Sequence, residues 1–278
     1  MKKALFPLTV LCMLLPVCAM AQNASDDEQS KSFSFELSDE GISTSYLWRG
    51  QEACGLNAQG DLSLNWEKND FCAFAGTWYI YGFQESIYGP FKTNAGQEWD
   101  LYLGLGYKGF TFTLSDDMST PYFSKGTYKA EIGDGVYEDI ETDNRTLKGD
   151  GHVIEASLEY YISDDIPLTL VWNTAIAGGG DVEMDETGNT YHRSFSTYIE
   201  AFYDFNIGNL PVDFTASAGF IPWMSPYIDD VEGAHVAWLG LRAGYDVPIY
   251  KSHTLPISLT AGFNPTAATF LWSFAIGF

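Results

Sequence analysis

The chain has 278 residues, of which 37 are acidic and 14 basic, and its formal net charge is −23. Such acidity argues against nucleic acids and anionic membrane surfaces as partners, because both repel a negatively charged protein. Aromatic residues make up 16% of the chain and charged residues 18%, whereas an average soluble domain has about 25% charged residues.

The N-terminus predicts a secretory signal peptide. Two lysines precede the apolar run Ala4–Val17, and the small residues Ala19 and Ala21 precede a cleavage point. We therefore expect residues 1–21 to be removed on export, and the polar residues 22–31 to form a flexible lead-in.

The rest of the chain contains no apolar run near the length of about 18 residues that a transmembrane helix needs. A membrane location would therefore require a β-barrel, because only helices and closed barrels pair all of their backbone groups within lipid.

The last stretch of the sequence, Thr269–Phe278, alternates large apolar residues with small or polar ones. A period of two predicts a β-strand, and in a membrane barrel the bulky face meets lipid while the small face lines the interior. The terminal aromatic resembles the C-terminal signature by which the assembly machinery recognises bacterial outer-membrane barrels. The set that we expect to face the membrane is Phe270, Trp272, Phe274, Ile276 and Phe278.

Similar alternation, divided by turn signals, recurs along the chain and predicts about twelve strands in residues 32–278. An even number is expected for an all-β, transmembrane antiparallel barrel whose termini both lie in the periplasm. The expected strands are Phe33–Arg49, Leu56–Trp66, Phe71–Phe83, Glu98–Tyr107, Phe110–Ser115, His152–Ile162, Leu168–Ala177, Ser194–Ile207, Val212–Phe220, Val236–Val247, Leu255–Phe263 and Thr269–Phe278.

The breaks between these strands alternate in length. Long breaks such as Gln84–Gln97 alternate with short ones such as Lys108–Gly109, as extracellular loops alternate with periplasmic turns in a membrane barrel. The first strand changes phase near Asp39–Gly41, which indicates a β-bulge. The third strand is aromatic on both faces, so its inner face stays unassigned. Cys54 and Cys72 fall at opposite ends of one hairpin, and we expect both to be reduced.

Motifs in the first third of the mature chain resemble the TorF family of porins. Residues 41–60 read GISTSYLWRGQEACGLNAQG and contain a Ser-x-Tyr-x-aromatic-Arg-Gly motif, and further matches lie in the third and fourth strands. The resemblance implies a small outer-membrane barrel that acts as a channel, and it says little about the solute. The residues that carry it are Ser45, Tyr46, Trp48, Arg49, Gly50, Gly76, Trp78, Asp100 and Tyr102.

Ionisable residues collect in the inward phase of the strands. A charge facing lipid at mid-depth costs about 2–4 kcal/mol, so a position in the lumen is strongly favoured. They could pair across a filled interior, or line a water-filled pore whose acidic wall favours cations. We expect the two arginines to be salt-bridged. The expected lumen set is Arg49, Glu98, Asp100, Glu155, Glu159, Glu200, Asp204, Asp213, Arg242 and Asp246.

Two acidic loops are candidate ligand sites. Asp116–Gly151 could enter the lumen, bind divalent cations or remain a solvated external loop, and the last reading is the simplest. Gly178–Asn189 lacks the glycine and glutamate of a calcium loop, so we expect a flexible acidic loop. His192 and Ser194 invite comparison with barrel lipases, but no nucleophile motif surrounds them. The other histidines are expected to be interfacial polar residues.

The sequence therefore predicts an outer-membrane channel of a Gram-negative bacterium, for passive diffusion of small hydrophilic solutes or cations. We expect no cofactor, no metal and no enzymatic activity, and the expected partners are outer-membrane lipids and the barrel assembly machinery. A structural or surface-interaction barrel with a filled lumen is the alternative, and a barrel enzyme is a more remote one.

Overall fold

The computed structural model describes residues 32–83, 97–119, 125–133, 136–143, 152–184, 190–223, 225, 233–250 and 253–278. The predicted signal peptide and lead-in lie outside the described residues. Every regular element in the described ranges is a β-strand. None of these ranges contains a helix long and apolar enough to cross a membrane.

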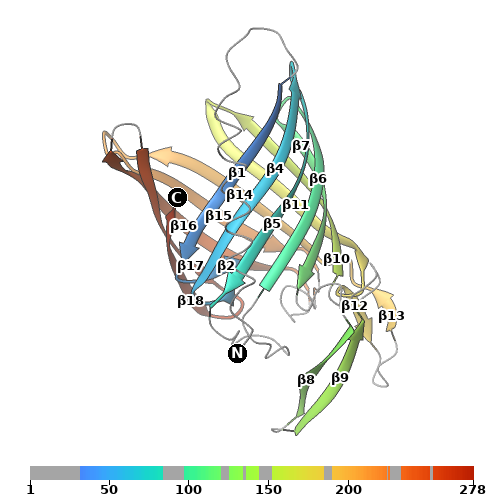
Figure 1. Cartoon of the computed structure of the whole chain (residues 1–278). Helices are drawn as coiled ribbons and strands as arrows, with labels where there is room; N and C mark the ends of the chain where they lie inside the picture. Colours follow the sequence, from blue (N-terminus) through green and yellow to red (C-terminus); the bar gives the residue numbers. More distant parts are fainter. Residues whose placement is uncertain are drawn as a thin grey trace, which may run out of the picture.

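Twelve strands form one closed antiparallel barrel (Figure 1), which confirms the predicted fold class. Successive wall strands pair along the chain, and the first and last strands pair to close the ring. The wall strands are β1 (Ser32–Ser43), β4 (Asn57–Lys68), β5 (Phe71–Gly82), β6 (Gln97–Tyr107), β7 (Phe110–Ser119), β10 (His152–Ser163), β11 (Ile166–Gly178), β14 (Thr197–Asn206), β15 (Asp213–Ile221), β16 (His235–Tyr250), β17 (His253–Asn264) and β18 (Thr269–Gly277).

The two ends of the barrel differ in their connections. At the end that we call the turn end, residues 69–70, 108–109 and 164–165 join neighbouring strands. Lys108 and Gly109 have φ values of 48° and 81°, as the two central residues of a type I′ hairpin turn require. All the long connections lie at the opposite end, which we call the loop end. The predicted alternation of loop lengths is thus confirmed.

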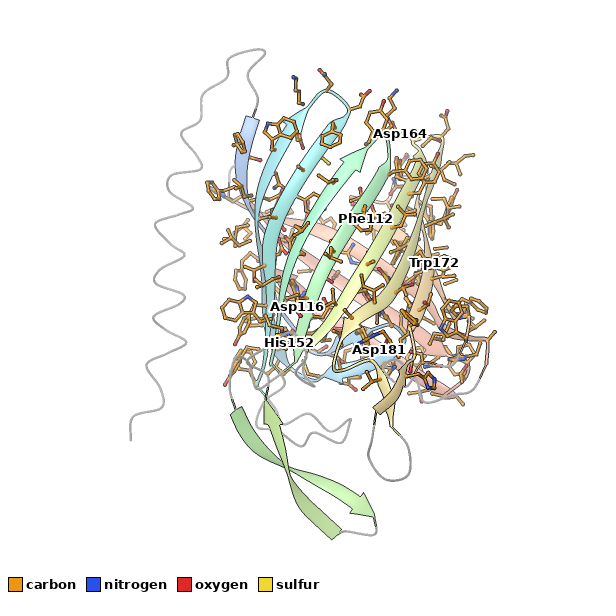
Figure 2. The ribbon with its side chains drawn as sticks, turned by 90° about the vertical axis from the view of Figure 1, so that its right-hand side faces the viewer. Phe112, Asp116, His152, Asp164, Trp172 and Asp181 are labelled. Atoms are coloured by element: carbon orange, nitrogen blue, oxygen red, sulfur yellow. The ribbon has the colours of Figure 1, made fainter. Side chains whose placement is uncertain are left out.

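Three small hairpins lie within the long connections. They are β2 (Tyr46–Trp48) with β3 (Gln51–Cys54), β8 (Lys125–Gly133) with β9 (Val136–Asp143), and β12 (Val182–Met184) with β13 (Thr190–Arg193). The β8–β9 hairpin projects away from the barrel beyond the loop end (Figures 1 and 2), so its described strands do not enter the lumen. Of the expected acidic loop, Asp116–Ser119 belong to the wall strand β7 instead.

The first predicted strand is corrected at its second half. The wall strand β1 ends at Ser43, and the residues that follow leave the wall to form the β2–β3 hairpin. The predicted bulge is confirmed, because the register with β4 shifts between Ser38 and Gly41. Alternation could not reveal the departure, because a strand inside the lumen keeps the same period of two.

The outer face of the wall is apolar and exposed, the reverse of a soluble sheet. Alternate positions on one strand show this, because Trp272 is 55% exposed while its neighbours Leu271 and Ser273 are buried. Figure 2 gives a side view of the wall, on which Phe112 and Trp172 belong to this exposed face. Such a closed barrel with an apolar exterior is compatible with an outer-membrane protein. The five C-terminal residues predicted to face lipid, Phe270, Trp272, Phe274, Ile276 and Phe278, are all exposed.

The inner face carries aromatic side chains that lie against glycines. A Cβ atom on Gly104 would come within 2.2 Å of the Phe74 ring, and one on Gly219 within 1.9 Å of the Tyr198 hydroxyl. The third predicted strand, whose inner face was unassigned, therefore turns Phe74 inward. These rings fill part of the lumen, and only glycine leaves room for them.

Substitutions at two adjacent residues of β17 test which face of the wall meets lipid. We expect Leu259→Arg, on the exposed face, to destabilise the barrel in phospholipid vesicles by about 2–4 kcal/mol, because a charge at mid-depth is poorly solvated. Ser258→Arg, whose side chain points inward, should cost much less. Denaturant titration of the folded barrel in vesicles measures both, and equal losses would contradict the assignment of faces.

Candidate functional site

The chain turns from the wall into the lumen directly after β1. Thr44 N donates to Phe274 O at 2.9 Å, and Phe274 N donates to Thr44 Oγ1 at 2.9 Å, so β18 holds the point of departure. The Ser273 hydroxyl then donates to Ser45 O, and the Ser45 hydroxyl donates to Glu52 Oε1 at 2.7 Å. These bonds fix the direction in which the β2–β3 hairpin leaves the wall.

Arg49 and Gly50 form the tip of this hairpin. Their φ values are 49° and 82°, again the type I′ combination. Asn264 of β17 donates its side-chain amide to Gly50 O at 3.1 Å. A Cβ atom on Gly50 would lie 2.0 Å from the Ala237 carbonyl oxygen, so the tip approaches the opposite backbone too closely for any other residue.

A buried ion pair anchors the tip to the far wall. Arg49 Nη2 lies 2.6 Å from Glu155 Oε1 and 2.7 Å from Oε2, and both side chains are less than 10% exposed. The guanidinium carbon also lies 4.6 Å from the ring centre of Trp48 and 5.4 Å from that of Tyr198. Trp48 packs against the buried cluster of Tyr198, Ile221 and Ala237.

The hairpin therefore crosses the lumen. It enters between β1 and β4, whereas its tip contacts β10, β14, β15, β16 and β17, which include strands on the opposite side of the ring. The barrel is consequently narrowed at its loop end by a segment that belongs to its own first long connection.

Acidic side chains gather beside the tip through the registers of β6, β7 and β10. Asp100 lies directly opposite Asp117, and Glu155 lies opposite Ser115, two residues from Asp117. Glu98, two positions before Asp100, interacts electrostatically with Arg49, Asp117 and Glu155. Arg49 thus stands within a wall of carboxylates.

The structure brings together half of the ten residues predicted for the lumen. Arg49, Glu98, Asp100, Glu155 and Glu200 belong to the narrowed region, since Glu200 of β14 also interacts electrostatically with Arg49. The others lie on inward positions nearer the turn end and do not join this group. They are Glu159 of β10, Asp204 of β14, Asp213 of β15, and Arg242 and Asp246 of β16.

The expectation of salt-bridged arginines is confirmed for Arg49, and it stays a prediction for Arg242. Arg49 is bound to Glu155, but within the described ranges no carboxylate lies within ion-pair distance of Arg242. The sequence could not separate the two cases, because the partner of Arg49 is 106 positions away in the chain.

Sequence reasoning missed two carboxylates of the inner face, Asp117 and Asp61, and a third, Asp116, that lies in the outer phase opposite Leu101. Asp117 was assigned to an external loop, but β7 continues past it. Tyr102 donates its hydroxyl to both oxygens of Asp61, at 2.7 Å. Asp116 lies 3.0 Å from Nδ1 of His152, and this histidine is 2% exposed, so it is not the interfacial residue that we expected. Alternation extended by four residues would have found Asp117.

Asp181 also differs from expectation. It lies in the segment predicted as a flexible acidic loop, yet it is fully buried and accepts a hydrogen bond from the Ser196 hydroxyl at 2.5 Å. Burial raises the pKa of the Asp181 carboxyl. Arg193 donates to Gly178 O at 2.7 Å and closes the same connection. The segment is thus a structural link between β11 and β14, while residues 185–189 lie outside the described residues.

In the part of the chain that the structure describes, no group of three or more His, Cys, Asp or Glu side chains is arranged to hold a metal ion. His192 faces Glu183 across the β12–β13 ladder. Cys54 and Cys72 are both free thiols, as predicted.

These features define a class of protein: a twelve-stranded β-barrel with an apolar exterior and a charged, partly filled interior, an architecture that fits porin-like outer-membrane proteins in general. Comparison with models of known protein families gave no match, and comparison with curated proteins gave no significant match. The resemblance to the TorF family therefore stays a prediction that rests on its motif residues, five of which build the β2–β3 hairpin and its approach.

Cys54, at the end of β3, reports whether the hairpin is docked. Burial raises the pKa of its thiol to about 11, and Glu98 and Glu52 add to the effect. Because the thiolate is the reactive form, we expect slow alkylation at pH 8 in a Cys72→Ala background. Arg49→Ala leaves Glu155 buried without its partner, at a cost of about 3–5 kcal/mol. The hairpin should then loosen, and alkylation should be about tenfold faster or more.

The double variant Arg49→Met with Glu155→Leu is the control for this prediction. It removes both charges and keeps apolar volume, so it should restore slow alkylation at least in part. Equal alkylation rates in the original protein and in Arg49→Ala would contradict the role of the ion pair in docking.

Proposed function

We propose that this protein is an outer-membrane porin-like channel for passive diffusion of small hydrophilic solutes or ions, with a preference for cations and no catalytic step. The closed barrel, its exposed apolar wall and its inward charges support the proposal. We orient the barrel in the membrane with its turn end toward the periplasm and its loop end toward the outside of the cell, because the even strand number and the loop lengths favour this orientation.

The observation that carries the proposal is the narrowed region at the loop end. Ions that pass the barrel there must move beside the β2–β3 hairpin, along the wall formed by β6, β7, β10 and β14. Rings of fixed carboxylates attract cations and repel anions at close range. This wall presents one arginine against five carboxylates, which are Glu98, Asp100, Asp117, Glu155 and Glu200.

Membrane lipids and the assembly machinery are the proposed partners. The exposed set of β18, from Phe270 to Phe278, would contact lipid in the folded barrel. The same strand would be recognised during assembly through its final aromatic residue. Neither partnership depends on the conduction that we propose.

Shortening the hairpin tests whether it limits conduction. We replace residues 46–54 with a short Gly-Ser linker between β1 and β4, which removes Arg49 and Trp48 from the lumen. Single-channel conductance in planar bilayers should rise about twofold or more, because the narrowest segment of the path is widened. Heat-modifiable migration of the variant controls for folding. An unchanged conductance in a folded variant would contradict the role of the hairpin.

Neutralising the acidic wall tests selectivity. The triple variant Glu98→Gln, Asp100→Asn and Asp117→Asn should move the reversal potential in a salt gradient toward that of a non-selective pore, since the field that attracts cations is weakened. The matched control is Asp70→Asn, an exposed carboxylate at the turn end. Anion selectivity of the original protein would refute the cation preference.

A structural or surface-interaction barrel with a filled lumen is the second candidate. The hairpin that crosses the lumen and the inward aromatic rings favour it. This candidate predicts no discrete channel openings with the full hairpin. Conductance steps in the original protein would exclude it.

A further inference from the structure

The wall of the barrel is interrupted where its first and last strands meet. β1 and β18 pair through Gly41–Ser43 and Ala275–Gly277. On the turn-end side of this contact, residues 32–38 of β1 pair with β4 and residues 253–256 of β17 pair with β16. Among the described strands, none joins these two edges. Figure 1 shows β1 diverging from β17 and β18 toward the turn end.

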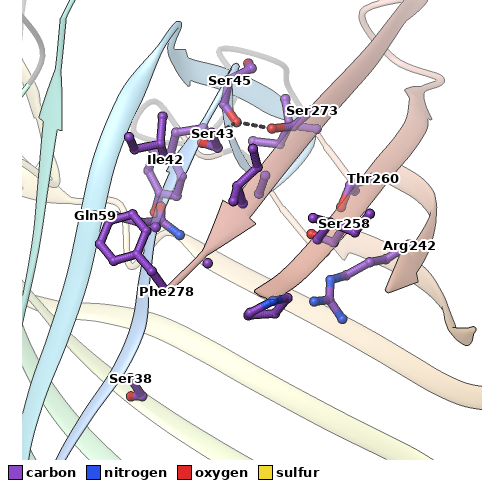
Figure 3. A pocket seen from close by; sticks show the side chains of 18 of the residues that line it. Ser38, Ile42, Ser43, Ser45, Gln59, Arg242, Ser258, Thr260, Ser273 and Phe278 are labelled. Carbon is purple, nitrogen blue, oxygen red and sulfur yellow. Dashed lines mark hydrogen bonds between the residues drawn. The ribbon is translucent and has the colours of Figure 1, made fainter. Parts of the chain in front are cut away.

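A cavity of about 720 Å³ lies in the lumen at this seam. Its volume is within the range of small-molecule sites, about 300–1,000 Å³. Tyr46 and Leu47 of the hairpin are among the residues that line it. Ser258 and Thr260 of β17 also line it and supply hydroxyl groups (Figure 3). The cavity is therefore separate from the acidic wall, whose carboxylates do not line it.

The residues that line the cavity come from both the inward-facing and the outward-facing positions of the wall strands. Ser38, Ser258 and Thr260 are inward positions, whereas Leu37, Ile257 and Phe278 belong to the apolar outer phase. In a continuous wall the outer phase is separated from the lumen by backbone. At the interrupted seam these apolar residues instead border the cavity, which gives it one polar side and one side toward the lipid.

Arg242 is the one charged side chain among the residues that line the cavity. It is exposed to the lumen, and its guanidinium group is directed into the cavity in Figure 3. Its register neighbours are Thr260 on β17 and Thr215 on β15, neither of which carries a charge. Unlike Arg49, it has no carboxylate within ion-pair distance in the described ranges.

We propose that this cavity binds a single-chain amphiphile with a carboxylate head group, which enters from the bilayer through the seam between β1 and β17. The carboxylate accepts charge-assisted hydrogen bonds from Arg242, supported by the hydroxyls of Ser258 and Thr260. The hydrocarbon chain lies along Leu37, Ile257 and Phe278 toward the lipid.

The edges of the seam favour such a ligand. Unpaired backbone groups along residues 32–38 and 253–256 are costly in hydrocarbon. A carboxylate and the water that accompanies it at the seam can hydrogen-bond to these groups, which a saturated chain alone cannot do. The proposal rests on the membrane location of the proposed function but not on conduction.

Binding of radiolabelled palmitate to the full barrel in phosphatidylcholine nanodiscs tests the proposal, with empty nanodiscs as background. We expect one saturable site per barrel. Arg242→Gln should weaken binding about tenfold or more, as loss of a charge-assisted hydrogen bond implies. Arg242→Lys should retain most of the affinity. Lys108→Gln, which removes an exposed charge at the turn end, should leave it unchanged.

Two further measurements separate the parts of the proposal. Palmityl alcohol, which has the same chain without the charge, should compete about tenfold less well than palmitate. Ser258→Phe, which fills the cavity and keeps Arg242, should abolish saturable binding while heat-modifiable migration confirms folding. Absence of a saturable site in the original protein, or equal affinity in Arg242→Gln, would overturn the proposal.

Failure of the proposed channel would be recognised independently. Planar-bilayer recordings without openings would refute conduction and leave palmitate binding intact. Conversely, normal conductance without palmitate binding would refute this site alone. A barrel that does not incorporate into nanodiscs would refute the membrane location on which both depend.

Discussion

The pairing of backbone groups in a closed ladder is the constraint on which the rest of this structure depends. Once each wall strand is bonded on both sides, side chains alternate strictly between an outer and an inner face. Leucines and aromatic rings cover the outer face, and glycines, hydroxyls and charges line the inner one. The proposed conduction path lies along the inner face, whose composition follows from this division.

Two departures from the regular ladder distinguish this barrel from a plain cylinder. After Ser43 the chain leaves the wall, and the β2–β3 hairpin crosses the lumen to bind Glu155 on the other side. At the same seam, β18 pairs with only the end of β1. The first departure narrows the lumen beside an acidic wall, and the second leaves a polar cavity in contact with the outer apolar face. Both originate where the ring closes.

The lumen is consequently divided by charge. Near the loop end, carboxylates surround the single guanidinium of Arg49, which is already bound. Near the seam, the guanidinium of Arg242 stands among hydroxyls without a carboxylate partner in the described ranges. A cation and an anionic amphiphile would therefore be drawn to different parts of one interior, which is why we assign them to separate sites.

The sequence by itself determined the strand number, the alternation of turns and loops, the bulge before Gly41 and the inward phase of residues such as Glu98 and Asp100. These features are local, because a period of two and the turn residues can be recognised within about ten positions. Only the tertiary structure decided that the motif around Arg49 folds into the lumen, that Asp117 joins its acidic wall, and that Arg49 is paired with Glu155. Each of these depends on strands that lie far apart in the chain and meet only when the ring closes, so the pattern of any one segment carries no record of them.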